Sequence, residues 1–309
     1  MSLGFSVEAL LARARGGGAL RMGLVRVPEA EWLTPDADLA ARAAVFAAEP
    51  NCVQVLPEAE AAVHEVGEML EGWTSAFPSR LRERLGEGLE PSSASSTSVP
   101  PPTPPANGRG AKAVAVLRTA AAGVWEDLCI LTPDASGQYW LTAAALAFPT
   151  DWHLAEKLDQ ALTPIHAPIH GYAEQLAAGV DHFFATLQPG PIFGRTNWFV
   201  VASDAWRYLP QDDPEARFAH VTADNAGQTL FVRCERQTLR RLPQSGAVLF
   251  TIGIHVEPLD RLSSGAVARV AQSVGGISSG EHERRAAPFY AEALTRYAER
   301  RNRSPELVA

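Results

Sequence analysis

Apolar residues recur with two different periods along this chain, and the change of period separates a helical first part from a mixed second part. In residues 57–73 the apolar positions are three and four apart, which is the spacing of one buried helix face. Thr34, Pro35 and Asp36 are typical of a helix start, and Phe77, Leu81 and Leu85 predict a further helix. The first 90 residues are therefore predicted to be helical.

Strand-like runs replace helices in the second half of the chain. Runs rich in β-branched and aromatic residues occupy 127–132, 138–148, 196–203, 228–237 and 247–259. The first two flank the turn sequence PDASG, which predicts a hairpin. Apolar positions in 170–187 form a helical stripe, and further helices are expected from about 259 to 300. The pattern predicts an α+β fold with an antiparallel sheet of about five strands and flanking helices.

One segment has neither period. Residues 91–112 begin PSSASSTSVPPPTPPANGRG, and Val99 is the only large apolar side chain in those letters. Such a composition cannot offset its own ordering entropy, so a flexible linker is expected here. It would separate a helical part, residues 1–90, from a main domain, residues 113–309.

Composition narrows the classes of partner. The chain has 309 residues and a formal net charge of −8, without a large Lys/Arg cluster, so nucleic acid and anionic membrane surfaces are not expected partners. The three cysteines form no CxxC pair, which argues against a disulfide framework or an iron–sulfur cluster held by this chain. No membrane span or signal-peptide pattern is evident, and we expect a cytoplasmic protein.

The GxGxxG, P-loop, HExxH and GxSxG motifs are all missing, so any chemistry must depend on less common motifs. His166 is the first candidate. Pro164 and Pro168 bracket it in PIHAP and restrict the backbone, so a stiff, non-helical segment before a helix is expected. A stiff backbone suits an axial haem ligand, whereas the plainer alternative is a loop histidine bonded to a carbonyl. His170 and His255 are the competing ligands.

The second candidate is the basic run LFVRCERQTLRRLP. Alternation in a strand puts Arg236 on the apolar face of Val232 and Cys234, so it needs a carboxylate, from the protein or from a ligand. Arg240 and Arg241 raise the local charge, and arginines of this kind either bind haem propionates or form a solvated basic turn. Glu235 points to the other face, where it either receives a cationic amine or pairs with a neighbouring arginine.

These stretches together resemble a known family. MGLVRV, EWLTPD, WEDLCIL, LAFPTDWHLAEKLDQALTPIHAPIHGY, VDHFFATL, RTNWFV and CERQTLRRLPQSGAVLFTI occur in this order and resemble the haem-binding subunit of haem-dependent oxidative N-demethylases, or dimethylamine monooxygenases. The chain departs from the family at His170, where a proline is expected, in the Pro/Ser-rich insertion, and near its end.

The resemblance implies a PAS-like haem domain over residues 113–309 that holds haem b through His166. It implies Arg236, Arg240 and Arg241 as candidates for the propionates. Glu235, from the interpretation of the basic run itself, is the candidate that would position the amine. The resemblance also implies oxygen- and NADPH-dependent removal of an N-methyl group from a dimethylamine-like secondary amine, with release of formaldehyde. NADPH, FMN and an iron–sulfur cluster would belong to partner reductase subunits. The alternatives are a haem sensor or carrier and a non-haem small-ligand module.

Overall fold

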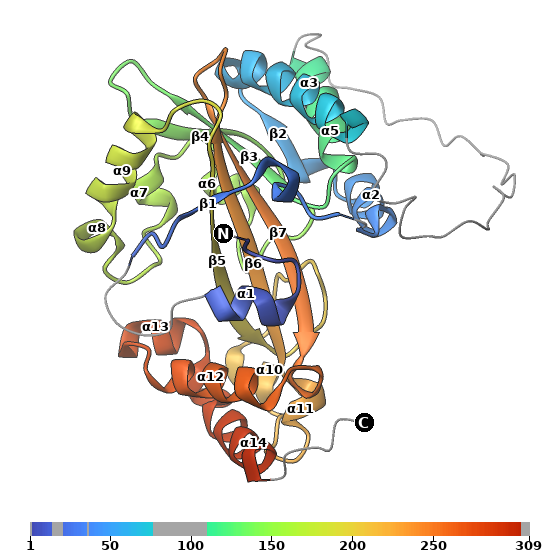
Figure 1. The fold of residues 1–309 in the computed structure, drawn as a ribbon, viewed down its shortest axis with the longest axis vertical. Coiled ribbons are helices and arrows are strands. Elements are labelled where there is room, and N and C mark those ends of the chain that lie inside the picture. Colours follow the sequence, from blue (N-terminus) through green and yellow to red (C-terminus); the bar gives the residue numbers. More distant parts are fainter. Residues whose placement is uncertain (1, 14–20, 36, 77–109, 304–309) are drawn as a thin grey trace, which may run out of the picture.

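A seven-stranded antiparallel sheet organises the chain (Figure 1). The structure is a computed structural model, and it describes residues 2–13, 21–35, 37–76 and 110–303. The strand order is β1-β5-β6-β7-β3-β4-β2, and every neighbouring pair is antiparallel. The strands are β1 (Val25–Val27), β2 (Val53–Val55), β3 (Asp127–Pro133), β4 (Tyr139–Ala145), β5 (Ile192–Val201), β6 (Phe231–Arg241) and β7 (Val248–Pro258).

The α+β class and the antiparallel sheet are confirmed, but the sheet has seven strands rather than about five. The five expected runs correspond to β3 to β7, and β3 and β4 form the expected hairpin. The two strands that the pattern missed, β1 and β2, have three residues each and lie at the two edges of the sheet. Three residues are too few to show an alternating period, so these strands are identified only by their pairing with β5 and β4.

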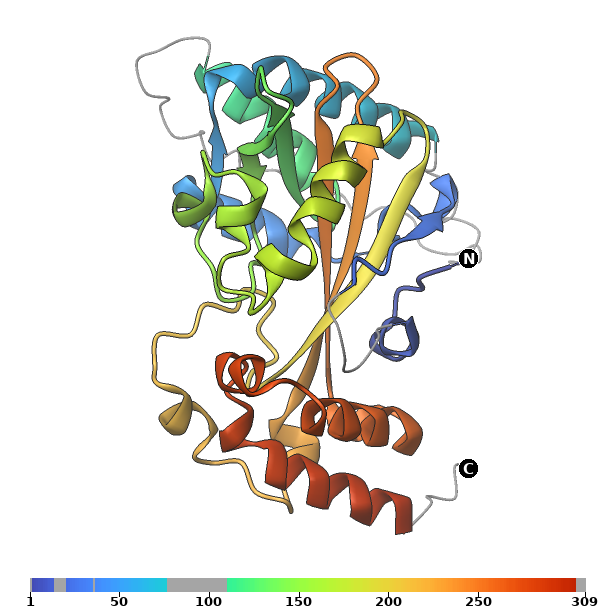
Figure 2. The same cartoon turned by 90° about the vertical axis from the view of Figure 1, so that its left-hand side faces the viewer.

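Helices surround the sheet on both faces and at both ends. Those described are α1 (Val7–Arg13), α2 (Leu39–Ala48), α3 (Glu60–Ala76), α5 (Gly110–Ala122), α6 (Leu154–Lys157), α7 (Leu162–Ile165), α8 (Tyr172–Gln175), α9 (Ala177–Thr186), α10 (Pro214–Phe218), α11 (Ala226–Thr229), α12 (Ser264–Gly275), α13 (Ser279–Arg284) and α14 (Ala291–Arg303). Figure 2 shows α1 on one side of β5 to β7 and α6 to α8 on the other. Helices α10 to α14 gather at the far end of the long strands (Figure 1).

Three expected segments differ in detail. The helix expected over 57–73 is α3, preceded by a short 3-10 turn at Pro57–Ala59. The stripe over 170–187 is divided between α8 and α9, which meet at Leu176. Helix α5 begins at Gly110, so the end of the segment expected to be a linker is helical. The rest of that linker and the helix expected from Phe77 lie outside the described residues.

Residues 1–90 are not purely helical, because they supply both edge strands of the sheet. Their buried side chains also belong to the same hydrophobic core as those of β3 to β7. Close contact is possible because β5 has Gly194 under the N-terminal segment. A Cβ at this position would lie 2.7 Å from Leu3 Cδ1 and 2.8 Å from Val27 Cγ2.

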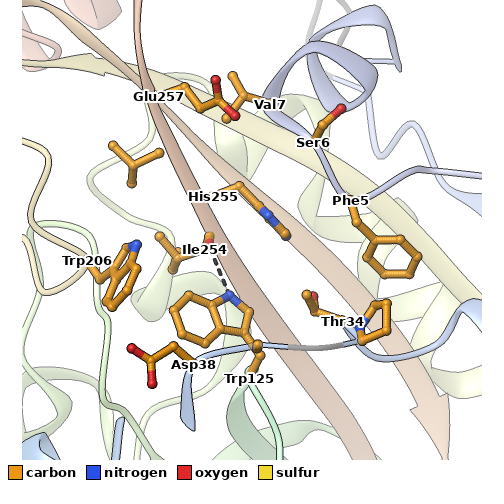
Figure 3. Close-up of a pocket in the computed structure, with 13 residues that line it drawn as sticks. Phe5, Ser6, Val7, Thr34, Asp38, Trp125, Trp206, Ile254, His255 and Glu257 are labelled. Atoms are coloured by element: carbon orange, nitrogen blue, oxygen red, sulfur yellow. Dashed lines mark hydrogen bonds between the residues drawn. The ribbon is translucent and has the colours of Figure 1, made fainter. Parts of the chain in front are cut away.

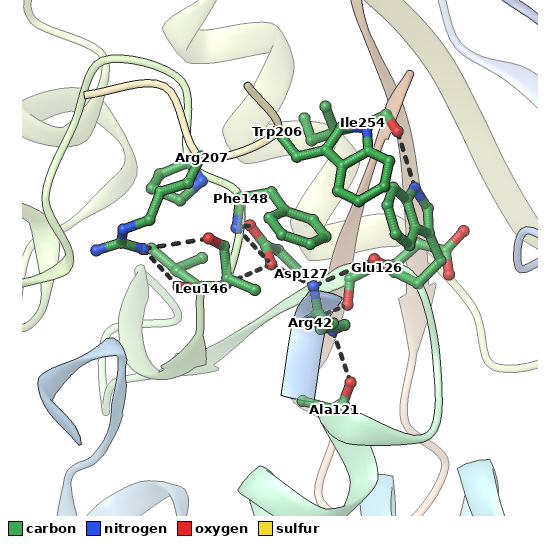
Figure 4. Close-up of polar contacts among 12 residues, drawn as sticks. Arg42, Ala121, Glu126, Asp127, Leu146, Phe148, Trp206, Arg207 and Ile254 are labelled. Carbon is green, nitrogen blue, oxygen red and sulfur yellow. Dashed lines mark hydrogen bonds and ion pairs between the residues drawn. The ribbon is translucent and has the colours of Figure 1, made fainter. Parts of the chain in front are cut away.

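A buried ion pair connects α2 to the start of β3 (Figure 4). The Arg42 and Asp127 side chains are 0% and 1% exposed, and Arg42 Nη1 lies 2.7 Å from Asp127 Oδ1. Arg42 also donates to the carbonyl oxygens of Ala121, Trp125 and Glu126, so it holds the turn between α5 and β3. Asp127 in turn accepts from the main-chain N–H groups of Ala147 and Phe148. Because every charge has close polar partners, burial of this pair is tolerated.

Candidate functional site

Strand β6 divides the predicted site residues between two faces of the sheet. Its side chains alternate, so Arg233, Glu235 and Gln237 share one face while Cys234 and Arg236 share the other. Burial lowers the pKa of Lys157, the last residue of α6, and the nearby Glu235 carboxylate opposes this shift, so the Glu235 face is the one toward helices α6 to α9. His166 lies among those helices. The structure therefore brings Glu235 and His166 to the same side.

His166 ends a short helix, which corrects the expectation of a non-helical segment. Helix α7 spans Leu162–Ile165, and His166 is its C-cap residue. Pro164 is tolerated because it lies in the first turn, where its missing N–H has no helical partner to lose. His166 Nδ1 lies 2.7 Å from the carbonyl oxygen of Leu162, and its ring stacks on Tyr172 at 4.4 Å between centroids. A carbonyl oxygen only accepts, so Nδ1 carries the proton and Nε2 keeps its lone pair.

The surroundings of His166 keep its ring neutral. Burial, together with the nearby charges of Lys157 and Arg195, lowers the pKa of His166 to about 4. The hydrogen bond to Leu162 opposes this shift but does not reverse it. A neutral imidazole with a free Nε2 is the form that binds a metal ion.

Two cations lie near His166, and the Glu235 carboxylate acts electrostatically on both. Burial lowers the pKa of Arg195, on β5, and that of Lys157. The Glu235 carboxylate opposes both shifts without reversing them. Glu235 Oε2 accepts hydrogen bonds from Asn197 Nδ2 at 3.2 Å and Gln237 Nε2 at 2.9 Å. Within the described residues, neither cation forms an ion pair shorter than 4 Å. On this side of the sheet, two positive charges therefore face the single negative charge of Glu235, and neither cation is in direct contact with a carboxylate of the described residues.

A buried hydroxyl completes this group. Tyr172 is 4% exposed, and its hydroxyl oxygen has no hydrogen-bond partner among the described residues. Burial, with a smaller contribution from Asp181 and against the charge of Arg195, raises the pKa of Tyr172 to about 12. The hydroxyl is thus a protonated donor beside a cation, an arrangement that suits an incoming carboxylate.

Arg236 and Arg240 lie on the opposite face. Arg236 Nε and Nη1 donate to the carbonyl oxygens of Gly4 at 3.2 Å and Trp32 at 2.7 Å, and Nη2 donates to that of Glu31. The guanidinium also lies 4.5 Å from the ring centroid of Phe5. The charge on the apolar face is thus accommodated by main-chain carbonyls of the N-terminal segment, rather than by the direct carboxylate contact that alternation led us to expect. Glu126 and Glu31 act on it electrostatically.

The two following arginines have separate partners. Arg240 Nη1 lies 2.6 Å from Glu29 Oε1, and its guanidinium lies over Trp32. Arg241 shares the face of Glu235 and donates to the hydroxyl of Tyr139 and the carbonyl of Phe184. Of the three predicted arginines, only Arg241 is on the side of His166.

The competing histidines have different surroundings from those of His166. His255 lies on the Arg236 face of β7 and borders a cavity of about 300 Å³ (Figure 3). Burial, helped by Arg236, lowers its pKa to about 4. His170 is exposed, and its main-chain N–H donates to Glu281 at 3.2 Å. No cluster of three metal-binding side chains of the His, Cys, Asp and Glu types occurs in the parts of the chain described here.

A comparison with protein families identifies the chain. The model of the family described as haem-dependent oxidative N-demethylase, alpha subunit-like, matches residues 26–294. The chain belongs to this family. For an alpha-subunit-like member of the haem-dependent oxidative N-demethylases, a haem-linked role and a multisubunit enzyme are the general expectation. None of the helices in the described ranges of this family member is long and apolar enough to span a bilayer.

Sequence reasoning missed several polar residues of the site in this N-demethylase-family chain. Arg195 and Asn197 alternate on β5 within RTNWFV, a stretch that was noted only as a family motif. They pair with Gln237 and Glu235 on β6. Alternation applied to both strands would have placed them beside Glu235. Lys157 carries no such signal, because its position depends on how α6 packs.

Proposed function

We propose that this chain is the haem b-binding subunit of its N-demethylase, in which His166 Nε2 would bind the haem iron. The observation that carries the proposal is the hydrogen bond of Nδ1 to Leu162, which fixes the ring and leaves Nε2 available. Histidines that bind metals usually donate their other N–H to a carbonyl or carboxylate in this way. The lowered pKa of His166 supports the same assignment, because protons do not compete for Nε2 near neutral pH.

The polar groups beside His166 fit the acid groups of a haem. We propose that the propionates would form ion pairs with the cations on this face, Arg195 and Lys157. Of the three arginines predicted from the sequence, only Arg241 would contribute. The unpartnered hydroxyl of Tyr172 supplies a further donor. Arg236 and Arg240 are less suitable, because they lie on the opposite face of the sheet, bound to the N-terminal segment and to Glu29.

The order of elements supports a PAS-like core. Strands β3 to β7 form a contiguous five-stranded part of the sheet, and the helices α6 to α9 between β4 and β5 lie together on one side of it. We propose that β1 and β2 are additions at the edges of this core.

The proposed reaction removes an N-methyl group from a small secondary amine such as dimethylamine. Haem, when bound, supplies the activation of dioxygen with electrons from NADPH, delivered by partner subunits that carry FMN and an iron–sulfur cluster. The chain's own contribution is positioning and the exclusion of water. The Glu235 carboxylate, held by Asn197 and Gln237, accepts an N–H of the amine and orients its methyl group. The products are the demethylated amine, formaldehyde, NADP⁺ and water.

Haem loading tests the ligand assignment. The full chain expressed with added haem should show a strong Soret band, and His166→Ala should lose haem or change the ligand-field spectrum. His255→Ala is the matched control, together with His153→Ala at the N-cap residue of α6, and both should keep the wild-type spectrum. An unaltered spectrum in His166→Ala would overturn the assignment.

Formaldehyde release tests the reaction. The haem-loaded chain, a flavin and iron–sulfur reductase, NADPH and dimethylamine should together produce formaldehyde, and Glu235→Gln should produce much less. A stable haem spectrum without formaldehyde from any methylamine would favour a sensor or carrier. Failure to bind haem at all would favour a non-haem ligand-binding module.

A further inference from the structure

The cavity that His255 borders lies where β7 extends beyond β3. The pairing of β7 with β3 stops at Ile252, whereas its pairing with β6 continues to Pro258. The strand therefore has an uncovered edge after Ile252, and a cavity of about 300 Å³ lies there between the N-terminal segment and two tryptophans (Figure 3). This volume is at the lower end of the range for small-molecule sites.

The walls of this cavity are aromatic and acidic. Phe5, Trp125 and Trp206 supply rings, and Asp38 and Glu257 supply carboxylates. None of the described residues that line it is a lysine or an arginine. Trp125 is held in place, because its Nε1 donates to the carbonyl oxygen of Ile254 at 2.8 Å and its ring packs edge-on against Trp206. The rings therefore form a pre-arranged wall.

An unsatisfied nitrogen borders the same space. His255 Nε2 is buried and has no hydrogen-bond partner among the described residues. A buried polar atom without a partner is costly, so such atoms mark places where a ligand or an ordered water completes the hydrogen bonding. Arg236, the cation whose charge acts on His255, is bound to main-chain carbonyls. It therefore does not offer its donors to the cavity.

The chemistry of the walls selects the charge of the ligand. An anion would meet two carboxylates and no lining cation, which is unfavourable. An uncharged apolar molecule would leave His255 Nε2 unsatisfied. An ammonium ion with apolar substituents satisfies all three features, because its charge complements the carboxylates, its substituents pack on the indole rings, and an N–H reaches the imidazole.

We propose that this cavity binds a small organic cation, a protonated amine with apolar substituents, against Trp125 and Trp206, with Asp38 and Glu257 balancing its charge and His255 Nε2 accepting an N–H. The site is separate from the proposed haem site, because His255 and Glu235 belong to opposite faces of the sheet. It does not depend on haem being bound.

Titration of the full chain with two probes tests the proposal. Trimethylammonium has one N–H and tetramethylammonium has none, so ligand-observed NMR at constant ionic strength should show both binding and trimethylammonium binding more tightly. In His255→Phe, which keeps a ring of similar size, the preference for trimethylammonium should disappear. Benzoate serves as the anionic comparison and should not bind.

Charge and ring variants complete the test. Glu257→Gln and Asp38→Asn should each weaken binding of both probes about fivefold, and Trp206→Leu by a similar factor. Asparagine keeps the helix cap that Asp38 forms with Ala40 N–H. Asp204→Asn, an exposed carboxylate outside the lining, is the matched control and should bind as wild type.

Three results would overturn the proposal: equal binding in Glu257→Gln, Asp38→Asn and wild type, stronger binding of benzoate than of either ammonium ion, or no binding of either. Glu257→Gln changes a partly exposed side chain, so it remains informative if Trp206→Leu does not fold. The Soret band of the same variants after haem loading should equal that of wild type. The two proposals fail separately. The haem assignment fails if His166→Ala keeps the wild-type Soret band, whereas the amine site fails if the cavity variants bind the ammonium probes like wild type.

Discussion

Replacing Asp127 by asparagine changes one atom in a fully enclosed site, so its effect on stability follows from the contacts already described. Asp127 Oδ1 accepts hydrogen bonds from Arg42 Nη1 at 2.7 Å and from the main-chain N–H of Ala147 at 2.7 Å. Oδ2 accepts one from the main-chain N–H of Phe148 at 3.0 Å. An asparagine has one oxygen and one NH₂ group, so in either orientation a donor faces a donor. It also leaves the Arg42 charge buried without a counter-charge.

The magnitude follows from these two losses. Removing one partner of a buried ion pair typically costs about 3–5 kcal/mol, and hydrogen bonds to charged groups are worth about 1.5–3 kcal/mol each. We therefore expect Asp127→Asn to lower the free energy of unfolding by about 3–5 kcal/mol, a large share of the roughly 5–15 kcal/mol typical of native proteins. Arg42→Met should cost a similar amount, because three carbonyl oxygens lose their donor.

Urea unfolding followed by circular dichroism measures both variants and their combination. The double variant should cost less than the sum of the single ones, because each change already removes the shared interaction. Asp212→Asn is the control: Asp212 pairs with Arg217 at 3.1 Å but is 52% exposed, so at most about 1 kcal/mol is expected. A loss below 1 kcal/mol for Asp127→Asn, or strict additivity with Arg42→Met, would refute the reasoning.

Three further predictions follow from other contacts. Burial lowers the pKa of His166 and of His255 to about 4 from 6.5, so unfolding takes up protons between these values; the free energy of unfolding should fall as pH drops from about 6.5 to 4. Urea titrations at pH 7 and 5 should show this loss of stability, and the loss should be smaller in His166→Phe. An equal change in the free energy of unfolding between the two pH values in both proteins would contradict the prediction. Gly194→Ala should cost about 1–3 kcal/mol in the same assay, because its Cβ would overlap the N-terminal segment; unchanged stability would show that this segment is not packed there. Arg195→Gln should weaken haem binding about tenfold in a Soret titration, whereas Arg236→Gln should lower thermal stability and leave haem affinity nearly unchanged; the reverse pattern would return the propionates to Arg236.

Much of the fold was predictable because its long elements have clear periods. Strands β3 to β7 are seven to eleven residues long, and their alternation also separates Glu235 from Arg236 correctly. Strand β1 was not predictable, because three residues carry no period and its pairing with β5 depends on contacts distant in sequence. Helix α7 was missed because the two prolines around His166 were taken to exclude helix, although the first turn accepts Pro164.

The candidate site was only partly predictable for a different reason. Sequence identifies which residues share a face of one strand, but it does not say what covers that face. Arg236 was correctly assigned to the apolar side. The carbonyl oxygens that accept its hydrogen bonds, however, belong to residues more than 200 positions away in the sequence. Arg195 and Lys157 join the site through strand pairing and helix packing. These features emerge only when the chain is folded.

The alternation of β6 has a consequence for how this family can vary. Adjacent residues of one strand serve two unrelated environments, an acid facing the helices and a base holding the N-terminal segment. Inserting or deleting a single codon within 231–241 would exchange these environments, bringing a cation beside His166 and a carboxylate among main-chain carbonyls. Natural relatives should therefore accept substitutions along this strand far more readily than changes in its length.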